Sequence, residues 1–159
     1  MTAKTIVKKD RPAEILLIED NYGDALLTQK AFAEVPIATH MTIAEDGEQA
    51  LGILRRQPPY EAAACPDLIL LDLNLPQMNG QEVLQQIKTD PVLKDIPVII
   101  LTSSRARADV QQCYDLYANA YIIKPIDPQE LSDIAHVISR FWFNMAVLSD
   151  HPCNLTTGG

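Results

Sequence analysis

The sequence predicts an α/β fold in which five parallel strands form a doubly wound sheet with helices on both faces. Short apolar runs alternate along the chain with segments whose apolar residues recur at helical spacing, the pattern of repeated strand–helix units. Two of the runs, 67–71 and 96–101, are apolar almost throughout, which is typical of strands buried on both faces. Sheets of this kind bind ligands beyond the carboxyl ends of their strands.

The first half of the chain supplies three strands and two helices. Residues 14–18 form a short apolar run followed by an acidic pair, and 22–34 carries apolar residues at helical spacing. A strand over 37–43 and a helix over 45–55 repeat the unit. The continuous run DLILL, 67–71, is the third strand.

The second half continues the alternation. Residues 80–88 form a short helix with its apolar residues on one side, and IPVIIL, 96–101, is the second continuous run. A helix over 105–117, a strand over 120–123 and a last helix over 128 to about 143 complete the pattern. Five strands, each followed by a helix, imply a parallel sheet with right-handed crossovers.

We expect one domain with a short extension at each end. Residues 1–13 are a polar, charged leader, residues 14–143 form the domain, and residues 144–159 form a C-terminal extension expected to be partly mobile. Three prolines in the stretch 55–66 predict a loop there, because proline continues neither a helix nor a strand ladder.

The composition argues against several classes of function. A net charge of −8 disfavours a nucleic-acid partner, since phosphate backbones bind basic surfaces. No run approaches the about 20 apolar residues of a membrane span, and the cationic N-terminus lacks the apolar core of a secretion signal. The three cysteines, Cys65, Cys113 and Cys153, are dispersed without metal-ligand spacing, so we expect reduced thiols.

Polar side chains follow four of the expected strands at their carboxyl ends. They are Glu19 with Asp20, Asp72 with Asn74, Thr102 with Ser103, and Lys124 with Pro125. Because the carboxyl ends of parallel strands meet at one edge, we expect these groups to converge on one crevice. Crowded carboxylates repel one another and favour a cation, and oxygen ligands near phosphate chemistry suit Mg²⁺. An ammonium and a hydroxyl in the same crevice suit phosphoryl oxygens.

Each of these signals has a simpler explanation when it is taken alone. The pair Glu19 and Asp20 could merely favour the dipole of the next helix, and one of residues 102–104 is expected to cap the helix that follows. Lys124 could be an ordinary solvated lysine. Asp72 is harder to explain, because a carboxylate that ends a buried apolar run costs free energy unless it is paired or used. All four signals fall at expected strand ends, which favours a shared site.

Four segments closely resemble the motifs of response-regulator receiver domains: ILLIEDN, LILLDLNLPQMNG, IPVIILTSS and AYIIKP. The resemblance extends over residues 14–143, and the spacings from Asp72 to Thr102 and from Thr102 to Lys124 match those of the family. It implies a flavodoxin-like receiver fold with strand order 2-1-3-4-5.

The resemblance also implies a Mg²⁺ site. Glu19 and Asp20 resemble the acidic pair that holds the ion directly or through water. Asp72 and the backbone carbonyl of Asn74 complete the implied set of oxygen ligands.

For the phosphoryl group, the resemblance implies three roles. Asp72 is the acceptor, Thr102 is the hydroxyl that follows the group, and Lys124 is the ammonium that contacts it. The Lys124–Pro125 bond is expected to be cis, a geometry that only X–Pro bonds adopt at low cost. Tyr121 resembles the switch aromatic whose rotation reports phosphorylation, although a half-buried strand tyrosine is the simpler interpretation.

The implied function is that of a two-component response regulator. A sensor histidine kinase would transfer a phosphoryl group from its phosphohistidine to Asp72, which would switch an interaction surface. Such a receiver assists its own phosphorylation and dephosphorylation, so we expect a cytoplasmic signalling protein and not an enzyme with a separate substrate. The chain after the last helix is too short for a further domain, which predicts signalling by docking or assembly.

Three further segments narrow the resemblance. GDALLTQKAF, CYDLYANAYIIKP and FWF are similar to the single-domain regulators that partner cyanobacterial phytochromes. The resemblance therefore implies a light-sensing kinase with a bound bilin as partner. Tyr117 stands where many receivers carry glycine, which questions the usual backbone conformation at that position.

The last helix is apolar on more than one side. The residues expected to face the sheet are Leu131, Ile134, Ile138, Phe141 and Met145. Those at other angles are Trp142, Phe143, Val147 and Leu148. Because such a helix needs burial on more than one side, we expect a homodimer contact built from this helix and its neighbours. The alternative is a tail that folds back over these groups within one monomer.

Three other functions fit a similar fold. A haloacid-dehalogenase-type phosphatase would share the LDLN aspartate but would need a second aspartate where Asn74 stands. A flavodoxin-like flavin binder would need a loop rich in hydroxyls and glycine where this chain has EDN. A pseudo-receiver would keep the fold and act only as a protein-binding module.

Overall fold

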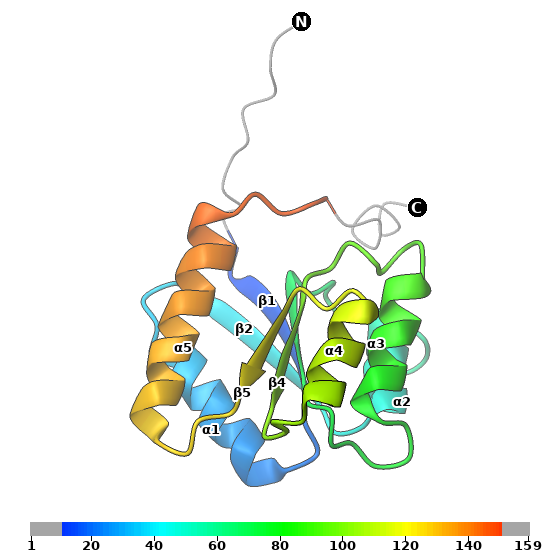
Figure 1. Ribbon diagram of the computed structural model, residues 1–159. Coiled ribbons are helices and arrows are strands. Elements are labelled where there is room, and N and C mark those ends of the chain that lie inside the picture. The colour runs from blue at the N-terminus through cyan, green and yellow to red at the C-terminus, as the bar shows by residue number, and fades with distance from the viewer. Residues whose placement is uncertain (1–10, 151–159) are drawn as a thin grey trace, which may run out of the picture.

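The computed structural model describes residues 11–150, so most of the expected leader and the end of the C-terminal extension lie outside the described residues. Five parallel strands form one sheet in the order β2-β1-β3-β4-β5 (Figure 1). The strands are β1 (Ala13–Ile18), β2 (Thr39–Ala44), β3 (Leu68–Leu71), β4 (Val98–Thr102) and β5 (Ala120–Ile123). The helices are α1 (Tyr22–Ala33), α2 (Gly47–Leu54), α3 (Gly80–Thr89), α4 (Arg107–Asp115), α5 (Pro128–Arg140) and the π-helical turn η1 (Phe141–Met145). The predicted fold class and strand order are confirmed.

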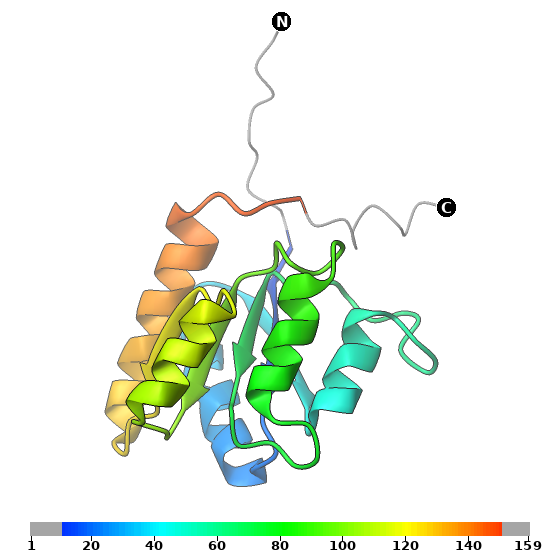
Figure 2. The same cartoon turned by 45° about the vertical axis from the view of Figure 1, so that its right-hand side comes forward.

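Helices cover both faces of the sheet. α1 packs against α5 on one face, and Figure 2 shows α2, α3 and α4 side by side on the other. Each face has its own apolar core, and β3 supplies both. Ile69 and Leu71 point into the core under α2 to α4, whereas Leu68 and Leu70 point into the core under α1 and α5. Burial on both faces explains why this strand is apolar without alternation.

Side-chain caps begin four of the five α-helices. The capping residues are Asn21, Asp46, Asn79 and Asp127, each accepting from a backbone N–H two or three residues later. The N-cap of α4 is Ala106 without a side-chain bond, so the predicted cap among residues 102–104 is wrong. The helix begins two residues later than expected, and Ser104 Oγ instead donates to Asp109 at 2.5 Å, within its first turn.

The second residue after α4, Tyr117, has the left-handed conformation for which glycine is favoured. Tyr117 has a φ of 69°, its N–H donates to the Tyr114 carbonyl at 3.0 Å, and the Ala118 N–H donates to the Cys113 carbonyl at 2.9 Å. This pattern is a Schellman motif. Arg56, with a φ of 51°, ends α2 in the same way. The backbone at Tyr117 therefore has the conformation that is usual for glycine at this position, although the sequence suggested that a tyrosine would change it.

The last helix departs from the prediction after Arg140. The wider turn of η1 changes the angle at which the following side chains leave the axis. Trp142 and Phe143 therefore pack against the core under α1 and α5, whereas Phe141 and Met145 are 49% and 65% exposed. The prediction that these last two face the sheet is wrong. The predicted inward residues that do pack against the core are Leu131, Ile134 and Ile138.

The cysteines differ from the prediction at one position. Cys113 is buried and free, as expected. Cys65 is disulfide-bonded, so the prediction of reduced thiols is wrong for this residue. Spacing along a sequence cannot show which cysteines approach each other in the fold. Cys153 lies outside the described residues.

The helices within residues 11–150 are too short or too polar to cross a membrane.

Candidate functional site

The carboxyl edge of the sheet brings together the residues predicted at the strand ends. The backbone ladder fixes two of them: the Asp72 N–H donates to the Ile18 carbonyl at 3.0 Å, and the Lys124 N–H donates to the Thr102 carbonyl at 2.8 Å. Their side chains leave neighbouring strands at the same level, as the parallel topology requires.

Asp72 is the centre of the site. Its side chain is buried, and Thr102 Oγ1 donates to Oδ1 at 2.8 Å, as does the Asn74 backbone N–H at 3.1 Å. Lys124 Nζ donates to the other oxygen, Oδ2, at 2.7 Å. Burial by itself raises the pKa of Asp72, but these three hydrogen bonds together outweigh it and hold the pKa below its ordinary value. The carboxylate is therefore kept ionised.

Glu19 lies beside Asp72 and is also buried. Burial raises the pKa of Glu19 to about 7, and the charge of Asp72 adds to this effect, while a hydrogen bond from Lys124 opposes it. Two carboxylates thus share one ammonium, which leaves a surplus of negative charge in the crevice.

Lys124 joins three carboxylates. Its Nζ donates to Glu19, to Asp72 and, at 3.2 Å, to Asp24 in the first turn of α1. Burial would lower the pKa of Lys124, but the hydrogen bonds and charges of Asp72 and Glu19 raise it well above its ordinary value. The interpretation of Lys124 as an ordinary solvated lysine does not fit these contacts.

The prediction of a cis peptide bond between Lys124 and Pro125 is wrong. Within residues 11–150 the cis peptide bond is Pro58–Pro59. The trans form of an X–Pro bond is favoured by about 0.5–1 kcal/mol unless its surroundings select the cis form. Lys124 reaches its three carboxylates from the trans form, so these contacts do not require the cis form.

Two predicted ligands lie at the rim of the crevice. Asp20 and Asn74 are exposed, and among the described residues no three His, Cys, Asp or Glu side chains form a ready metal cluster. Lys124 occupies the space between Glu19 and Asp72. The available donors are nevertheless carboxylate and carbonyl oxygens, the types that a hard divalent cation prefers. The donor set therefore fits such an ion, with Lys124 as its competitor for Glu19.

Tyr121 connects the site to the loop before α4. Its side chain is half-buried, and its hydroxyl donates to the Ser104 carbonyl at 2.9 Å. Ser104 lies two residues after Thr102, which is fully buried against Asp72. A shift of Thr102 would therefore move the acceptor of the Tyr121 hydrogen bond.

Two residues of the site were not predicted from the sequence. Asp24 contacts Lys124, but an acidic residue in the first turn of a helix already has an explanation in the helix dipole. Gly80 packs against the backbone of the acceptor strand end: a Cβ there would lie 2.5 Å from both the Asp72 carbonyl oxygen and Leu73 Cα. The NG pair before the third helix was the available signal for Gly80, since glycine often marks a close backbone approach.

Comparison with known proteins gives consistent matches over this region. Residues 15–136 match the family model of the response regulator receiver domain. Response regulator Rcp1 of Synechocystis sp. is 40% identical over 137 residues, which are 86% of this chain and 93% of that protein.

Solved structures match over a similar length. The phosphorylated cyanobacterial phytochrome response regulator RcpA superimposes with a TM-score of 0.84 at 41% identity, covering 88% of this chain and 100% of that chain. The Mn²⁺-bound form of Rcp1 gives a TM-score of 0.81 at 40% identity, covering 87% of this chain and 99% of that chain. The matched family region includes every side chain of the crevice, from Glu19 to Lys124. The chain belongs to the response-regulator receiver family of two-component signalling proteins.

Proposed function

We propose that this chain accepts a phosphoryl group on Asp72 from the phosphohistidine of a sensor histidine kinase, and that this kinase is a phytochrome. The observation that carries the proposal is a buried, ionised carboxylate held by donors from β4, from the residue after β5 and from its own loop. The similarity to the phytochrome response regulator RcpA supports the choice of kinase.

In the proposed transfer, an oxygen of Asp72 bonds to phosphorus while the bond from the kinase imidazole nitrogen to phosphorus breaks. The nitrogen keeps the electron pair of that bond. Lys124 Nζ, now on Oδ2, would move to a phosphoryl oxygen and offset its charge, and Thr102 Oγ1 would donate to another. The Asn74 N–H would keep Asp72 oriented through Oδ1.

We propose Mg²⁺ as the ion of this site, with Glu19, Asp20, Asp72 and the Asn74 carbonyl as the residues that would hold it. When bound, the ion would supply positive charge against the transferring phosphoryl group. The raised pKa of Glu19, near 7, supports a need for a cation beyond Lys124, because burial and a neighbouring carboxylate both oppose its ionisation. The Mn²⁺-bound form of Rcp1 supports a divalent ion in this family.

We propose Tyr121 as the residue that reports phosphorylation. The new phosphoryl group would draw Thr102 toward it, and the loop carrying Ser104 would follow. The hydrogen bond from Tyr121 to Ser104 would then break or lengthen, changing the surface formed by α4, β5 and α5.

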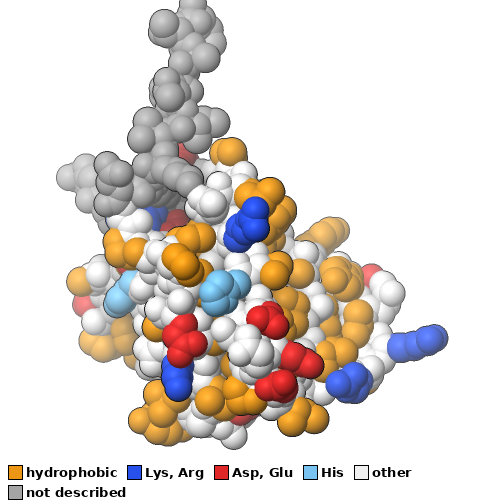
Figure 3. Space-filling model, turned by 90° about the vertical axis from the view of Figure 1, so that its left-hand side faces the viewer, with side chains coloured by type: hydrophobic (Ala, Val, Ile, Leu, Met, Phe, Trp, Pro, Cys, Tyr) orange, Lys and Arg blue, Asp and Glu red, His pale blue; other side chains and the backbone are white. Residues whose placement is uncertain are grey.

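The proposal also covers assembly and location. The chain would act in the cytoplasm as a homodimer, without a nucleic-acid or membrane partner and without turnover of a separate substrate. Val137 and Phe141 are 67% and 49% exposed, and Figure 3 shows hydrophobic side chains among charged ones on the side of the molecule that carries α5. The net charge of −8 supports the exclusion of nucleic acid. The division into 1–13, 14–143 and 144–159 stays a prediction.

A phosphotransfer assay tests kinase and acceptor together. Autophosphorylated histidine kinases, including phytochromes held in red or far-red light, are mixed with the wild-type chain and with Asp72→Asn. We expect light-dependent transfer from a phytochrome to the wild type and none to the variant. Rapid transfer only from other kinases would exclude a phytochrome as the partner. Equal labelling of Asp72→Asn would exclude Asp72 as the phosphoacceptor. A wild-type chain that no kinase and no small phosphodonor labels would instead favour a pseudo-receiver.

A further inference from the structure

The helix α4 is held in place by fewer apolar side chains than the other α-helices. Of its nine residues only Cys113 is buried, whereas the ten residues of α3 include four buried ones. No side chain caps its first turn, in contrast to the other four α-helices. Helices in proteins owe most of their stability to tertiary packing, so α4 depends more than its neighbours on polar contacts. Weakly packed elements of this kind are the ones that move at low cost.

Asp109, in the first turn of α4, makes these polar contacts. Ser104 Oγ donates to Asp109 Oδ2 at 2.5 Å, and Gln81 Nε2 donates to Asp109 Oδ1 at 3.4 Å. The bond from Ser104 is short and charge-assisted, and such bonds are about twice as strong as those between neutral groups. The bond from Gln81 is long and therefore weaker.

The two donors belong to the two chain segments that carry the phosphorylation site. Ser104 lies two residues after Thr102, whose hydroxyl donates to the acceptor carboxylate. Gln81 follows Gly80, which packs against the backbone of the acceptor, and Figure 2 shows α3 and α4 side by side. Asp109 therefore connects α4 to the segments that follow both β3 and β4.

An acidic residue in the first turn of a helix also has a simpler explanation in the helix dipole. The dipole requires only the charge, whereas Asp109 is half-buried and accepts from two donors outside its own helix. The two explanations differ in what they expect of Ser104. Loss of the serine hydroxyl leaves the interaction with the dipole intact but removes the stronger of the two bonds.

We propose that Asp109 is the positioning residue that fastens α4 to the phosphorylation site in the resting protein, and that phosphorylation of Asp72 releases it. The release rests on the proposed function, because the shift of Thr102 toward the phosphoryl group carries Ser104 with it. The short bond from Ser104 to Asp109 then lengthens, and Gln81 holds the carboxylate only weakly. The first turn of α4 becomes mobile, which changes the surface that this helix offers to a partner.

Hydrogen–deuterium exchange of the full-length chain, followed by mass spectrometry, tests the fastening before any phosphate is added. Ser104→Ala removes the hydroxyl but keeps the main-chain carbonyl at this position, which accepts from Tyr121. We expect exchange over residues 107–115 to be about tenfold faster in Ser104→Ala and in Asp109→Ala than in the wild type. This factor is the one that loss of a hydrogen bond to a charged group implies.

Asp115→Ala is the matched control. Its carboxylate also belongs to α4 and accepts from a side chain, that of Gln111 at 2.9 Å, but this bond is exposed and stays within the helix. Exchange over residues 107–115 should be no faster in this variant than in the wild type, and exchange over α5 should be the same in all the proteins. Wild-type exchange over residues 107–115 in Ser104→Ala would overturn the proposal, since the dipole explanation predicts it. An equal rise over α4 and α5 would indicate general destabilisation and would overturn it as well.

The same measurement after treatment with acetyl phosphate and Mg²⁺ tests the release, with the phosphate content read from the intact mass. We expect exchange over residues 107–115 to rise about tenfold in the phosphorylated wild type and to rise little further in Ser104→Ala, where the bond is already absent. Unchanged exchange in a wild type whose mass includes the phosphate would overturn the release. A wild type without added mass would instead contradict the proposed function, and the unphosphorylated variants would still decide whether Asp109 fastens α4.

Discussion

Asp72 directly follows β3, whose residues are fully buried, and Leu73 after it is buried as well. An ionised carboxylate in such a place costs several kcal/mol unless donors compensate it, which is why the sequence alone pointed to this residue. Its donors come from Thr102, Lys124 and the backbone N–H of Asn74. The sequence predicted the first two beside Asp72, but it predicted Asn74 as a metal ligand through its carbonyl and not as a donor. Asp24 could not be predicted, because its contact with Lys124 depends on how the start of α1 lies against the end of β5.

Gly80→Ala tests the close approach behind the acceptor. A Cβ at this position would lie 2.5 Å from the Asp72 carbonyl oxygen and 2.5 Å from Leu73 Cα, so the backbone on either side must move. We expect a loss of about 2 kcal/mol in the free energy of unfolding, measured in urea, with slower phosphate uptake. Gly23→Ala is the matched control, since its nearest such contact is 3.4 Å and alanine favours a helix. Equal effects of the two substitutions would contradict the steric account.

The buried thiol of Cys113 predicts how the free energy of unfolding depends on pH. Burial raises the pKa of its thiol from 9.0 to about 11, so the folded chain keeps a proton that the unfolded chain loses between these values. The free energy of unfolding should therefore fall as the pH rises from about 9 to 11, by about 2 kcal/mol from this residue. Cys113→Ala should lack this part of the decrease when urea unfolding is measured at pH 8 and 10.5. A parallel decrease in both proteins would show that the thiol is not responsible.

At the scale of elements, the sequence predicts all five strands and the five α-helices, with ends that differ by a few residues. Hydrophobic periodicity carries this information because each strand and helix buries a defined face. It failed at η1, where a π-turn alters the angle of Phe141 and Met145. A change of helical pitch depends on packing around Trp142 and leaves no periodic signal.

The end of α4 stores backbone strain that a substitution can remove. Tyr117 adopts a φ of 69° with its side chain 76% exposed, so glycine would relieve the strain and lose little packing. We expect Tyr117→Gly to raise the free energy of unfolding by about 1 kcal/mol in urea. Arg56→Gly is the contrasting variant, because Arg56 Nε donates to the Ala63 carbonyl at 3.0 Å and that bond would be lost. A destabilised Tyr117→Gly would show that the tyrosine side chain contributes more than its exposure indicates.

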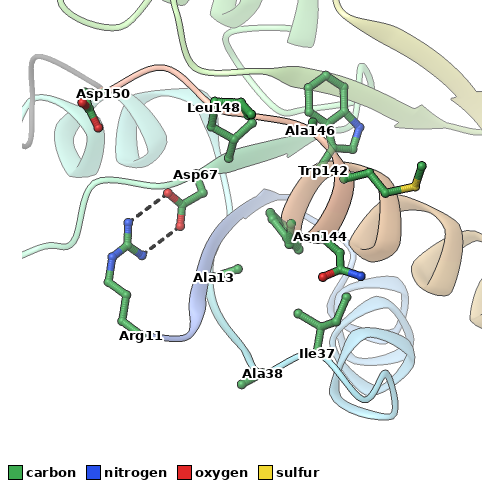
Figure 4. Close-up of a pocket in the computed structure, with 13 residues that line it drawn as sticks. Arg11, Ala13, Ile37, Ala38, Asp67, Trp142, Asn144, Ala146, Leu148 and Asp150 are labelled. Atoms are coloured by element: carbon green, nitrogen blue, oxygen red, sulfur yellow. Dashed lines mark hydrogen bonds and ion pairs between the residues drawn. The ribbon is translucent and has the colours of Figure 1, made fainter. Parts of the chain in front are cut away.

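The whole molecule carries a polar crevice and a pocket at opposite edges of the sheet. The carboxyl edge gathers Asp72, Lys124 and Thr102, where phosphoryl chemistry is proposed. The amino-terminal edge carries the pocket, about 520 Å³ in volume, which Trp142 and the segment 146–150 line (Figure 4). α5 runs between these two edges, so its surface is the one through which the proposed phosphorylation would alter a partner contact far from Asp72.

Substitutions that place a charge on the exposed apolar surface of the last helix test the proposed homodimer. Val137→Glu and Phe141→Glu place a carboxylate on exposed apolar positions of the last helix, and each should lower the sedimentation coefficient toward that of a monomer. Val92→Glu, at an exposed apolar position in the loop between α3 and β4, should leave the sedimentation coefficient unchanged. Monomeric sedimentation of the wild type, with and without phosphorylation, would exclude the dimer.

Covalent labelling with acetyl phosphate and Mg²⁺, followed by identification of the modified residue, tests the central claim most directly. The account predicts acid-labile phosphate on Asp72, none on Asp72→Asn, and retained labelling of Asp24→Asn, which alters a neighbour of Lys124 but leaves the acceptor. Undiminished labelling of Asp72→Asn, or phosphate mapped to another residue of the wild type, would contradict it.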